Sequence, residues 1–288
     1  MENRINELLK YGYEILKDKK IDSYVLDVQL LLGKAINKDR LFIFINGNYE
    51  VTKEEAEDYY GYLKLREKKM PVKYILGECE FMGMNFLVTP GVLIPRPDTE
   101  TLVEQALQEI NGGGICNICD LCCGTGAIGL SIAKFTDNVD VKCCDISPMA
   151  LKVTAENIKR FSLQKRVQVV ESDLLQYFIK NKVKFNMIVS NPPYIEKNMI
   201  DKLMDDVKNY EPYEALCGGE DGLEFYRKIA EESLKVLNKG GVLMLEIGYD
   251  QKEKVSCILK KNGFQNISCI KDLSGKNRVI RAVLGKAL

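Results

Sequence analysis

Residues 115–129 read ICNICDLCCGTGAIG, an apolar run followed by a glycine-rich turn. The part from Ile115 to Leu121 is apolar enough for a central strand, and the pattern from Leu130 to Lys134 is helical. Glycines between a strand and a helix allow positive φ and bring backbone N–H groups close to a ligand. A second strand, Val139 to Cys144, precedes Asp145, the place where an acidic residue commonly binds ribose hydroxyls. The stretch predicts a doubly wound α/β domain with a cofactor loop.

The spacing of Gly124, Gly126 and Gly129 also fits the dinucleotide fingerprint G-x-G-x-x-G, so a nicotinamide or flavin enzyme is a rival interpretation. A single match of this kind is weak. The rival must also account for Asn191-Pro192-Pro193-Tyr194, which follows the predicted strand Phe185 to Ser190. Hydride transfer to a small substrate gives no reason for that motif, whereas an S-adenosylmethionine-dependent methyltransferase explains both features.

The Asn-Pro-Pro-Tyr motif predicts a pocket for a planar amine. Proline donates no backbone hydrogen bond and turns the chain outward, which leaves carbonyls unpaired. The Asn191 side-chain oxygen and one such carbonyl can accept both hydrogens of an NH2 group, and the Tyr194 ring offers a face to a flat amide or base. Because such nitrogens are poor nucleophiles, we expect in-line methyl transfer catalysed by positioning and electrostatics. The chain has no His, the commonest general base.

Beyond these motifs, the sequence resembles the PrmC/HemK family of protein-glutamine methyltransferases over nearly its whole length. The stretches that carry the resemblance are 94–100 (IPRPDTE), 120–129, Asp145, Ser172-Asp173, 191–194 and 210–223. It implies methyl transfer from S-adenosylmethionine to the side-chain amide nitrogen of the glutamine in the Gly-Gly-Gln motif of class I peptide chain release factors. This reaction, with S-adenosylhomocysteine as its product, supports translation termination. Two alternatives remain: an adenine or guanine N-methyltransferase acting on DNA or rRNA, and a catalytically silent binding module.

The resemblance also implies roles for individual residues. Asn191, Pro192 and Tyr194 would be catalytic and, with Pro193, would bind the glutamine amide. The cofactor would be held by Cys122, Cys123, Gly124, Thr125, Gly126, Asp145, Asp173 and Leu174. Family members often have Gly and a small hydroxyl residue in place of Cys122 and Cys123. Cys122 is expected to be barred from backbone conformations reserved for glycine, which bears on cofactor affinity.

The cysteines Cys116, Cys119 and Cys122 repeat at C-x-x-C spacing, which raises the question of a metal site. On a strand, residues three apart point to opposite faces, so Cys116 and Cys119 would not converge on one ion. Cys143 and Cys144 alternate in the same way on the next strand. The prediction is therefore buried free thiols and no metal.

Composition predicts an intracellular enzyme. The 288 residues are 46% hydrophobic, enough for one large domain and a small one, and no apolar run approaches the roughly 18 residues of a membrane span. The amino terminus lacks the apolar core of a signal peptide. Lys plus Arg and Asp plus Glu both number 41, so no overall basic field attracts nucleic acid. We expect a cytoplasmic monomer with no membrane partner and no stable nucleic-acid partner.

Three segments are predicted along the chain. Residues 1–72 have helical spacing, with a capping box at Thr52 and Glu55, and predict a small helical bundle that the family resemblance makes the release-factor recognition domain. Residues 73–90 predict a β-hairpin linker, with strands Cys79 to Phe81 and Asn85 to Val88. Residues 91–288 predict the class I, Rossmann-like methyltransferase domain.

Within the methyltransferase domain, we expect a helix from about Asp98, its N-cap, to Ile110. The stretch Arg96 to Glu100 could be a clamp under the sheet or a wall of the amide pocket. Residues 195–222 are expected to be a mobile or irregular insertion that contacts substrate. A helix over 223–237 and strands over 242–247, 264–270 and 278–284 would complete a seven-stranded sheet. The family resemblance implies that the last hairpin of this sheet is antiparallel.

Overall fold

The computed structural model describes residues 3–114 and 116–285, and its chain divides into two compact units. One unit extends to Glu78 and includes Met204–Tyr210, and the other comprises Cys79–Leu203 and the chain from Glu211 onward. The predicted boundary at residue 72 therefore falls at the start of a helix that belongs to the first unit. The part of the chain that is described contains no helix long and apolar enough to cross a membrane.

The first unit is a helical bundle. Its core consists of the apolar positions that the helical spacing singles out, among them Leu8, Val28, Leu32 and Leu63. The predicted capping box is present, because Thr52 and Glu55 each accept a hydrogen bond from the other's backbone N–H. The helices are α1 (Ile5–Asp18), α2 (Tyr24–Ala35), α3 (Arg40–Ile45), α4 (Lys53–Glu67), α5 (Val72–Leu76) and α10 (Asp205–Lys208).

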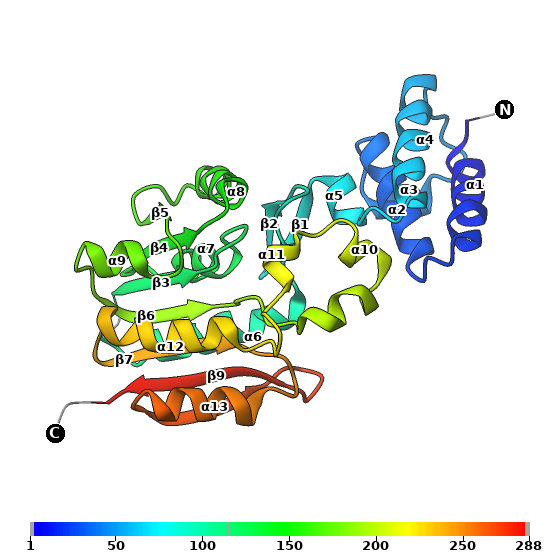
Figure 1. Cartoon of the computed structure of the whole chain (residues 1–288). Helices are drawn as coiled ribbons and strands as arrows, with labels where there is room; N and C mark the ends of the chain where they lie inside the picture. The colour runs from blue at the N-terminus through cyan, green and yellow to red at the C-terminus, as the bar shows by residue number, and fades with distance from the viewer. Residues whose placement is uncertain (1–2, 115, 286–288) are drawn as a thin grey trace. The chain divides into compact units, whose positions relative to one another are not determined.

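The second unit is built on the predicted seven-stranded sheet, and its strand order is β5-β4-β3-β6-β7-β9-β8 (Figure 1). The first five of these pair in parallel, and β9 is antiparallel to both of its neighbours, so the antiparallel last hairpin is confirmed. The strands are β3 (Asn117–Leu121), β4 (Asp140–Asp145), β5 (Val167–Glu171), β6 (Phe185–Ser190), β7 (Leu237–Glu246), β8 (Phe264–Lys271) and β9 (Asn277–Leu284). Ile115, where the first of these strands was expected to begin, lies outside the described residues.

Helices cover both faces of this sheet and form two separate apolar layers. One layer packs under α6 (Glu100–Asn111), α7 (Ala127–Phe135) and α8 (Pro148–Arg160), and the other under α9 (Gln176–Lys180), α12 (Glu224–Val236) and α13 (Lys252–Lys261). Figure 1 shows α12 and α13 lying across the face of the sheet that is nearer the viewer. Cys143 belongs to the first layer and Cys144 to the second, as strand alternation predicts.

The hairpin is present, with strands β1 (Glu78–Phe81) and β2 (Met84–Leu87) joined by Met82 and Gly83, which both have positive φ. The N-cap prediction for Asp98 is wrong. A 3-10 turn, η1 (Pro97–Thr99), precedes α6, and the Asp98 carboxylate forms an ion pair with Arg278 at 2.9 Å. The ion pair occupies the carboxylate that was expected to cap the helix.

The prediction of an irregular insertion over residues 195–222 is wrong for much of this segment. In the second unit it forms η2 (Lys197–Lys202) and α11 (Tyr213–Leu216). The N–H of Ile195 donates to the carbonyl of Leu216 at 3.0 Å, and the N–H of Gly218 donates to the carbonyl of Ile195 at 2.8 Å. These bonds hold the beginning of the segment, directly after the Asn-Pro-Pro-Tyr motif, against its later part.

Candidate active site

A cavity of about 550 Å³ lies beside the carboxyl ends of β3, β4 and β6. The chain runs outward from β3 through β4 to β5 and then returns to place β6 on the other side of β3. The strand order therefore reverses between β3 and β6, and open α/β sheets bind their ligands at such a reversal. The cavity coincides with the place that the topology favours.

The floor of the cavity is the loop after β3. Its residue Cys122 has φ +58°, a left-handed conformation that favours glycine, so the expectation that a Cys there could not adopt it is wrong. The loop is held from outside by Thr154, whose hydroxyl donates to the Gly124 carbonyl at 2.9 Å, and by Asn157, whose amide donates to the Thr125 carbonyl at 3.0 Å. These contacts hold the loop in a fixed shape at the N-terminus of α7.

Asp145 lies at the end of β4 and faces the same cavity. One carboxylate oxygen accepts from the N–H of Gly124 at 2.9 Å and the other from the N–H of Ser147 at 3.0 Å. Burial raises its pKa, and the backbone hydrogen bonds oppose that rise. The carboxylate keeps acceptor capacity beyond these backbone bonds, so it can accept from a hydroxyl of a ligand.

Apolar side chains form the wall next to Asp145. Ile146 is 61% exposed although it is a large aliphatic residue, and it lines the cavity together with Leu174 and Phe225. Such a surface suits a flat heteroaromatic ring. Ile146 and Phe225 were not among the site residues predicted from the sequence. Ile146 could have been predicted, because it is an apolar residue directly after the predicted ribose-binding Asp145. Phe225 lies inside a helix, where no sequence signal marks it as a site residue.

Asn191 presents its side chain to the cavity directly after β6. Its Nδ2 donates to the Thr99 hydroxyl at 3.3 Å, and its Oδ1 has no hydrogen-bond partner among the described residues. The backbone carbonyls of Pro192 and Pro193 likewise accept no hydrogen bond from any residue that the structure describes. Unpaired acceptors thus cluster at the motif, as the proline argument anticipates.

Tyr194 lies differently from the rest of the motif. Its ring packs against the apolar layer under α12, and its hydroxyl donates to Glu246 Oε1 at 3.5 Å. Burial, followed by the nearby Glu246 carboxyl, raises the pKa of Tyr194 to about 12, so the phenol stays a donor. Its carbonyl accepts from Gln251 Nε2 at 3.0 Å. That the ring offers a face to the acceptor stays a prediction.

The structure brings most of the predicted site residues together. The predicted residues that line the cavity beside β3, β4 and β6 are Cys122, Cys123, Gly124, Thr125, Asp145, Asp173, Leu174, Asn191 and Pro193. Gly126, Pro192 and Tyr194 do not line it. Gly126 instead occupies the N-cap position of α7 with φ +77°.

The stretch Arg96 to Glu100 contributes to the wall of the cavity and also makes structural contacts, because Asp98 pairs with Arg278 of β9. Arg96 and Thr99 line the cavity, and Arg96 Nη2 forms an ion pair with the buried Glu211 at 2.5 Å. Glu100 instead points to the hairpin, where it accepts from the N–H of Met82 at 2.7 Å. Glu246 was also missed, although an acidic residue at the end of an apolar strand is the signal that identified Asp145.

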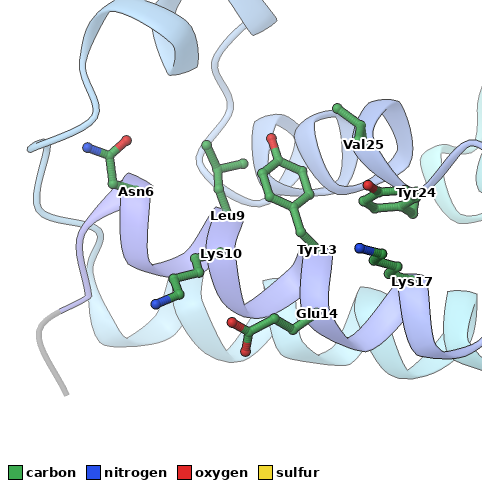
Figure 2. A pocket seen from close by; sticks show the side chains of 8 residues that line it. All are labelled: Asn6, Leu9, Lys10, Tyr13, Glu14, Lys17, Tyr24 and Val25. Atoms are coloured by element: carbon green, nitrogen blue, oxygen red, sulfur yellow. The ribbon is translucent and has the colours of Figure 1, made fainter.

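A second hollow, of about 470 Å³, lies on the helical unit. Figure 2 shows the side chains that line it, which come from α1 and the beginning of α2. Tyr13 and Tyr24 meet edge to face there with ring centroids 6.1 Å apart, and Lys10, Glu14 and Lys17 supply the charges. Among the described residues, no group of three or more His, Cys, Asp or Glu side chains could hold a metal ion there or elsewhere.

The fold and the site together define a Rossmann-like methyltransferase. The features that define it are the doubly wound sheet, the glycine loop, the acidic residue after the second strand and the Asn-Pro-Pro-Tyr turn. Comparison with known proteins narrows this class. The methyltransferase small domain family matches residues 97–207, and the PrmC N-terminal domain family matches residues 7–77. The chain belongs to the family of release factor glutamine methyltransferases.

Two relatives and one solved structure illustrate the similarity. A release factor glutamine methyltransferase of Clostridium botulinum is 54% identical over 96% of this chain and 98% of its own length. That of Clostridium acetobutylicum is 48% identical over 98% of this chain and 99% of its own length. A T. thermophilus 16S rRNA methyltransferase, solved with AdoMet and guanosine, has a TM-score of 0.52 at 18% identity, with 72% of this chain and 49% of that chain covered. This last similarity shows the fold alone.

Proposed function

We propose that the protein transfers a methyl group from S-adenosylmethionine to the side-chain amide nitrogen of the glutamine in the Gly-Gly-Gln motif of class I release factors. The observation that carries this proposal is the position of Asn191, which lines the same cavity as Asp145 and the glycine loop and whose Oδ1 has no hydrogen-bond partner among the described residues. The names of the two clostridial relatives support the choice of substrate.

The residues of the cavity fit the proposed cofactor. Asp145 has acceptor capacity for a ribose hydroxyl, and Ile146, Leu174 and Phe225 offer an apolar surface to adenine. A Cβ built on Gly124 would come no closer than 3.8 Å to any neighbour, so the loop leaves room for a ligand. When bound, S-adenosylmethionine would supply an electrophilic methyl group.

The chain's own contribution is to orient the amide nitrogen. Asn191 Oδ1 and the free carbonyl of Pro193, both from residues that line the cavity, can accept the two amide hydrogens and draw electron density onto the nitrogen. This holds the nitrogen for in-line attack without a strong base. The amide proton is lost during or after attack, when the positive charge that develops on nitrogen acidifies it. Positioning of the amide nitrogen by backbone and side-chain oxygens is therefore the main contribution to the rate enhancement.

The direct test uses labelled S-adenosylmethionine and purified release factor, with a Gln→Ala change in the Gly-Gly-Gln motif as the control. Duplex DNA and rRNA are present as competing acceptors. Label on wild-type release factor alone supports the proposal. Label on nucleic acid would replace it with base methylation, and cofactor binding without any transfer would indicate a silent module.

We further propose that the helical unit recognises the body of the release factor. Its helix α3 exposes Phe44 to 86%, beside the exposed Leu41 and Ile45, and such a patch is typical of a protein contact. Phe44→Ser should therefore raise the KM for intact release factor and leave the KM for a short Gly-Gly-Gln peptide unchanged. An equal change in both KM values would contradict this role, and the exposed Tyr177→Ser in the other unit serves as the control.

A further inference from the structure

A small polar cluster lies behind the Asn-Pro-Pro-Tyr motif. At its centre is Glu246, which is 1% exposed at the carboxyl end of β7. Its Oε1 accepts from the Tyr194 hydroxyl at 3.5 Å, its Oε2 has no hydrogen-bond partner among the described residues, and the neighbouring Thr99 hydroxyl lowers its pKa. Thr99, itself buried, accepts the hydrogen bond from Asn191 Nδ2 at 3.3 Å. A buried carboxyl, a buried hydroxyl and the motif's amide thus form one chain of contacts.

The direction of the hydrogen bonds in this chain follows from counting hydrogens. A threonine hydroxyl has one hydrogen to donate and two lone pairs to accept with. In the structure the Thr99 hydroxyl accepts from Asn191 Nδ2 at 3.3 Å, and its own hydrogen stays available to the neighbouring Glu246 carboxyl. The Asn191 amide must then turn its NH2 group toward Thr99 and its Oδ1 away from it.

This direction matters for the reaction because only an oxygen can receive a hydrogen of the acceptor's amide. If Thr99 donated to Asn191 instead, the side chain would turn its NH2 group toward the cavity, where two NH2 groups would oppose each other. The main chain of the motif has a separate support, because Gln251 Nε2 donates to the Tyr194 carbonyl at 3.0 Å and Gln251 Oε1 accepts from the N–H of Gly248 at 3.0 Å. Thr99 therefore acts on the side chain of Asn191 and not on the backbone of the motif.

We propose that Thr99 is a positioning residue: its hydroxyl accepts from Asn191 Nδ2 and so turns the Asn191 Oδ1 toward the acceptor amide. This inference rests on the proposed function for the identity of the acceptor. The geometry within the chain does not depend on that identity.

The test compares Thr99→Val, which keeps the shape and removes the hydroxyl, with Thr99→Ser, which restores it. Thr101→Val makes the same change at a buried threonine two residues further along that does not line the cavity. We expect Thr99→Val to lower kcat on release factor about 10-fold to 100-fold, as a misplaced reacting group does. Thr99→Ser should recover most of this loss, and Thr101→Val should match wild type. The Kd for S-adenosylmethionine should be unchanged throughout.

A second arm separates positioning from general damage. In the Asn191→Ala background, Thr99→Val should have no further effect on kcat, because the side chain on which Thr99 acts is gone. An equal loss of kcat in both backgrounds would overturn the proposal. So would wild-type kcat in Thr99→Val.

A third arm does not require activity. In a ¹⁵N–¹H spectrum, the signal of the Asn191 side-chain amide, assigned by its disappearance in Asn191→Ala, should shift in Thr99→Val and not in Thr101→Val. A signal that stays in place in Thr99→Val would overturn the positioning role. If wild-type protein methylates no release factor while the Asn191 signal shifts as expected, the proposed substrate fails and the inference about Thr99 stands.

Discussion

Asn191 combines two features that rarely occur together, a lining position in a cavity and a side-chain oxygen without a hydrogen-bond partner among the described residues. We expect Asn191→Ala to lower kcat about 100-fold, the effect of removing one group that stabilises a transition state. Cofactor affinity should change little, because Asp145 and the glycine loop are untouched. Kinetics on release factor and a titration with S-adenosylmethionine measure the two effects. Equal losses in kcat and affinity would contradict the assignment, and Asn138→Ala, at the opposite edge of the sheet, is the control.

Cys122 is the other residue whose conformation has a measurable consequence. At φ +58°, a residue that branches at Cβ is strained more than an unbranched one. We therefore expect Cys122→Val to be less stable than Cys122→Ala by about 1 kcal/mol, the scale of a left-handed backbone penalty. Urea unfolding of both variants measures the difference, and equal midpoints would show that the loop relaxes when the thiol is removed.

At the scale of elements, the segment after the motif is held closely against it. A Cβ on Gly218 would lie 2.7 Å from the Tyr194 Cα and 2.9 Å from the Pro193 carbonyl oxygen. Both neighbours are backbone atoms, so Gly218→Ala must displace the motif itself. We expect this variant to lose most of its kcat on release factor, and a kcat within a factor of two of wild type would show that the contact can relax.

Gly61 provides the matched control for Gly218→Ala. It lies inside α4, where an added Cβ would meet nothing within 4 Å. Gly61→Ala should therefore keep full activity and stabilise the helix by about 0.5–1 kcal/mol, the advantage of Ala over Gly in a helix interior. Thermal unfolding measures this gain.

The sequence predicts the elements that follow a regular apolar pattern. Prediction from the sequence fails where contacts between residues far apart in the chain determine the local structure. β6 was predicted with its observed bounds because its apolar run is bounded by the motif, and the seven-stranded sheet was anticipated from similar runs. In contrast, Asp98 was assigned to a helix cap because its partner Arg278 is 180 residues further along the chain. The order within residues 195–222 depends on hydrogen bonds between distant parts of the segment, such as that from the N–H of Lys197 to the carbonyl of Gly219, which no local pattern contains.

The candidate site divides in the same way. The glycine loop, Asp145 and Asn191 each follow an apolar strand, so their convergence at one edge of a parallel sheet could be inferred from chain order. The roles of Thr99 and Glu246 could not be predicted from the sequence, because these roles depend on the burial of both residues behind the motif and on their proximity to each other. The prediction for Cys122 relied only on the preference of glycine for the left-handed region, and the structure places Cys122 in that region nevertheless.

At the scale of the whole molecule, two buried carboxyls couple folding to pH. Asp120 lies under the glycine loop, where burial raises its pKa to about 7 and the hydrogen bond from the N–H of Gly129 opposes the rise. Burial likewise raises the pKa of Glu246 to about 7, against the effects of Thr99 and Arg278. The hydrogen bond of Glu109 with Arg281 lowers the pKa of that carboxyl, so its contribution falls at more acid pH.

The sign of the pH dependence follows from proton binding. Between the ordinary carboxyl range and pH 7, the folded state binds more protons than the unfolded state, because Asp120 and Glu246 hold their protons only when buried. Their contribution to stability is complete below about pH 4 and is lost as the pH rises through about 7. We therefore expect the Tm of the ligand-free protein to fall between pH 5 and 7.5, and Asp120→Asn, which cannot ionise, to show a shallower fall. Circular dichroism melts across this range measure both, with the exposed Asp137→Asn as the control. A Tm that rises with pH over this interval in wild type would mean that both carboxyls are already ionised in the folded protein, and that the Thr99 hydroxyl meets a carboxylate at every pH in this range.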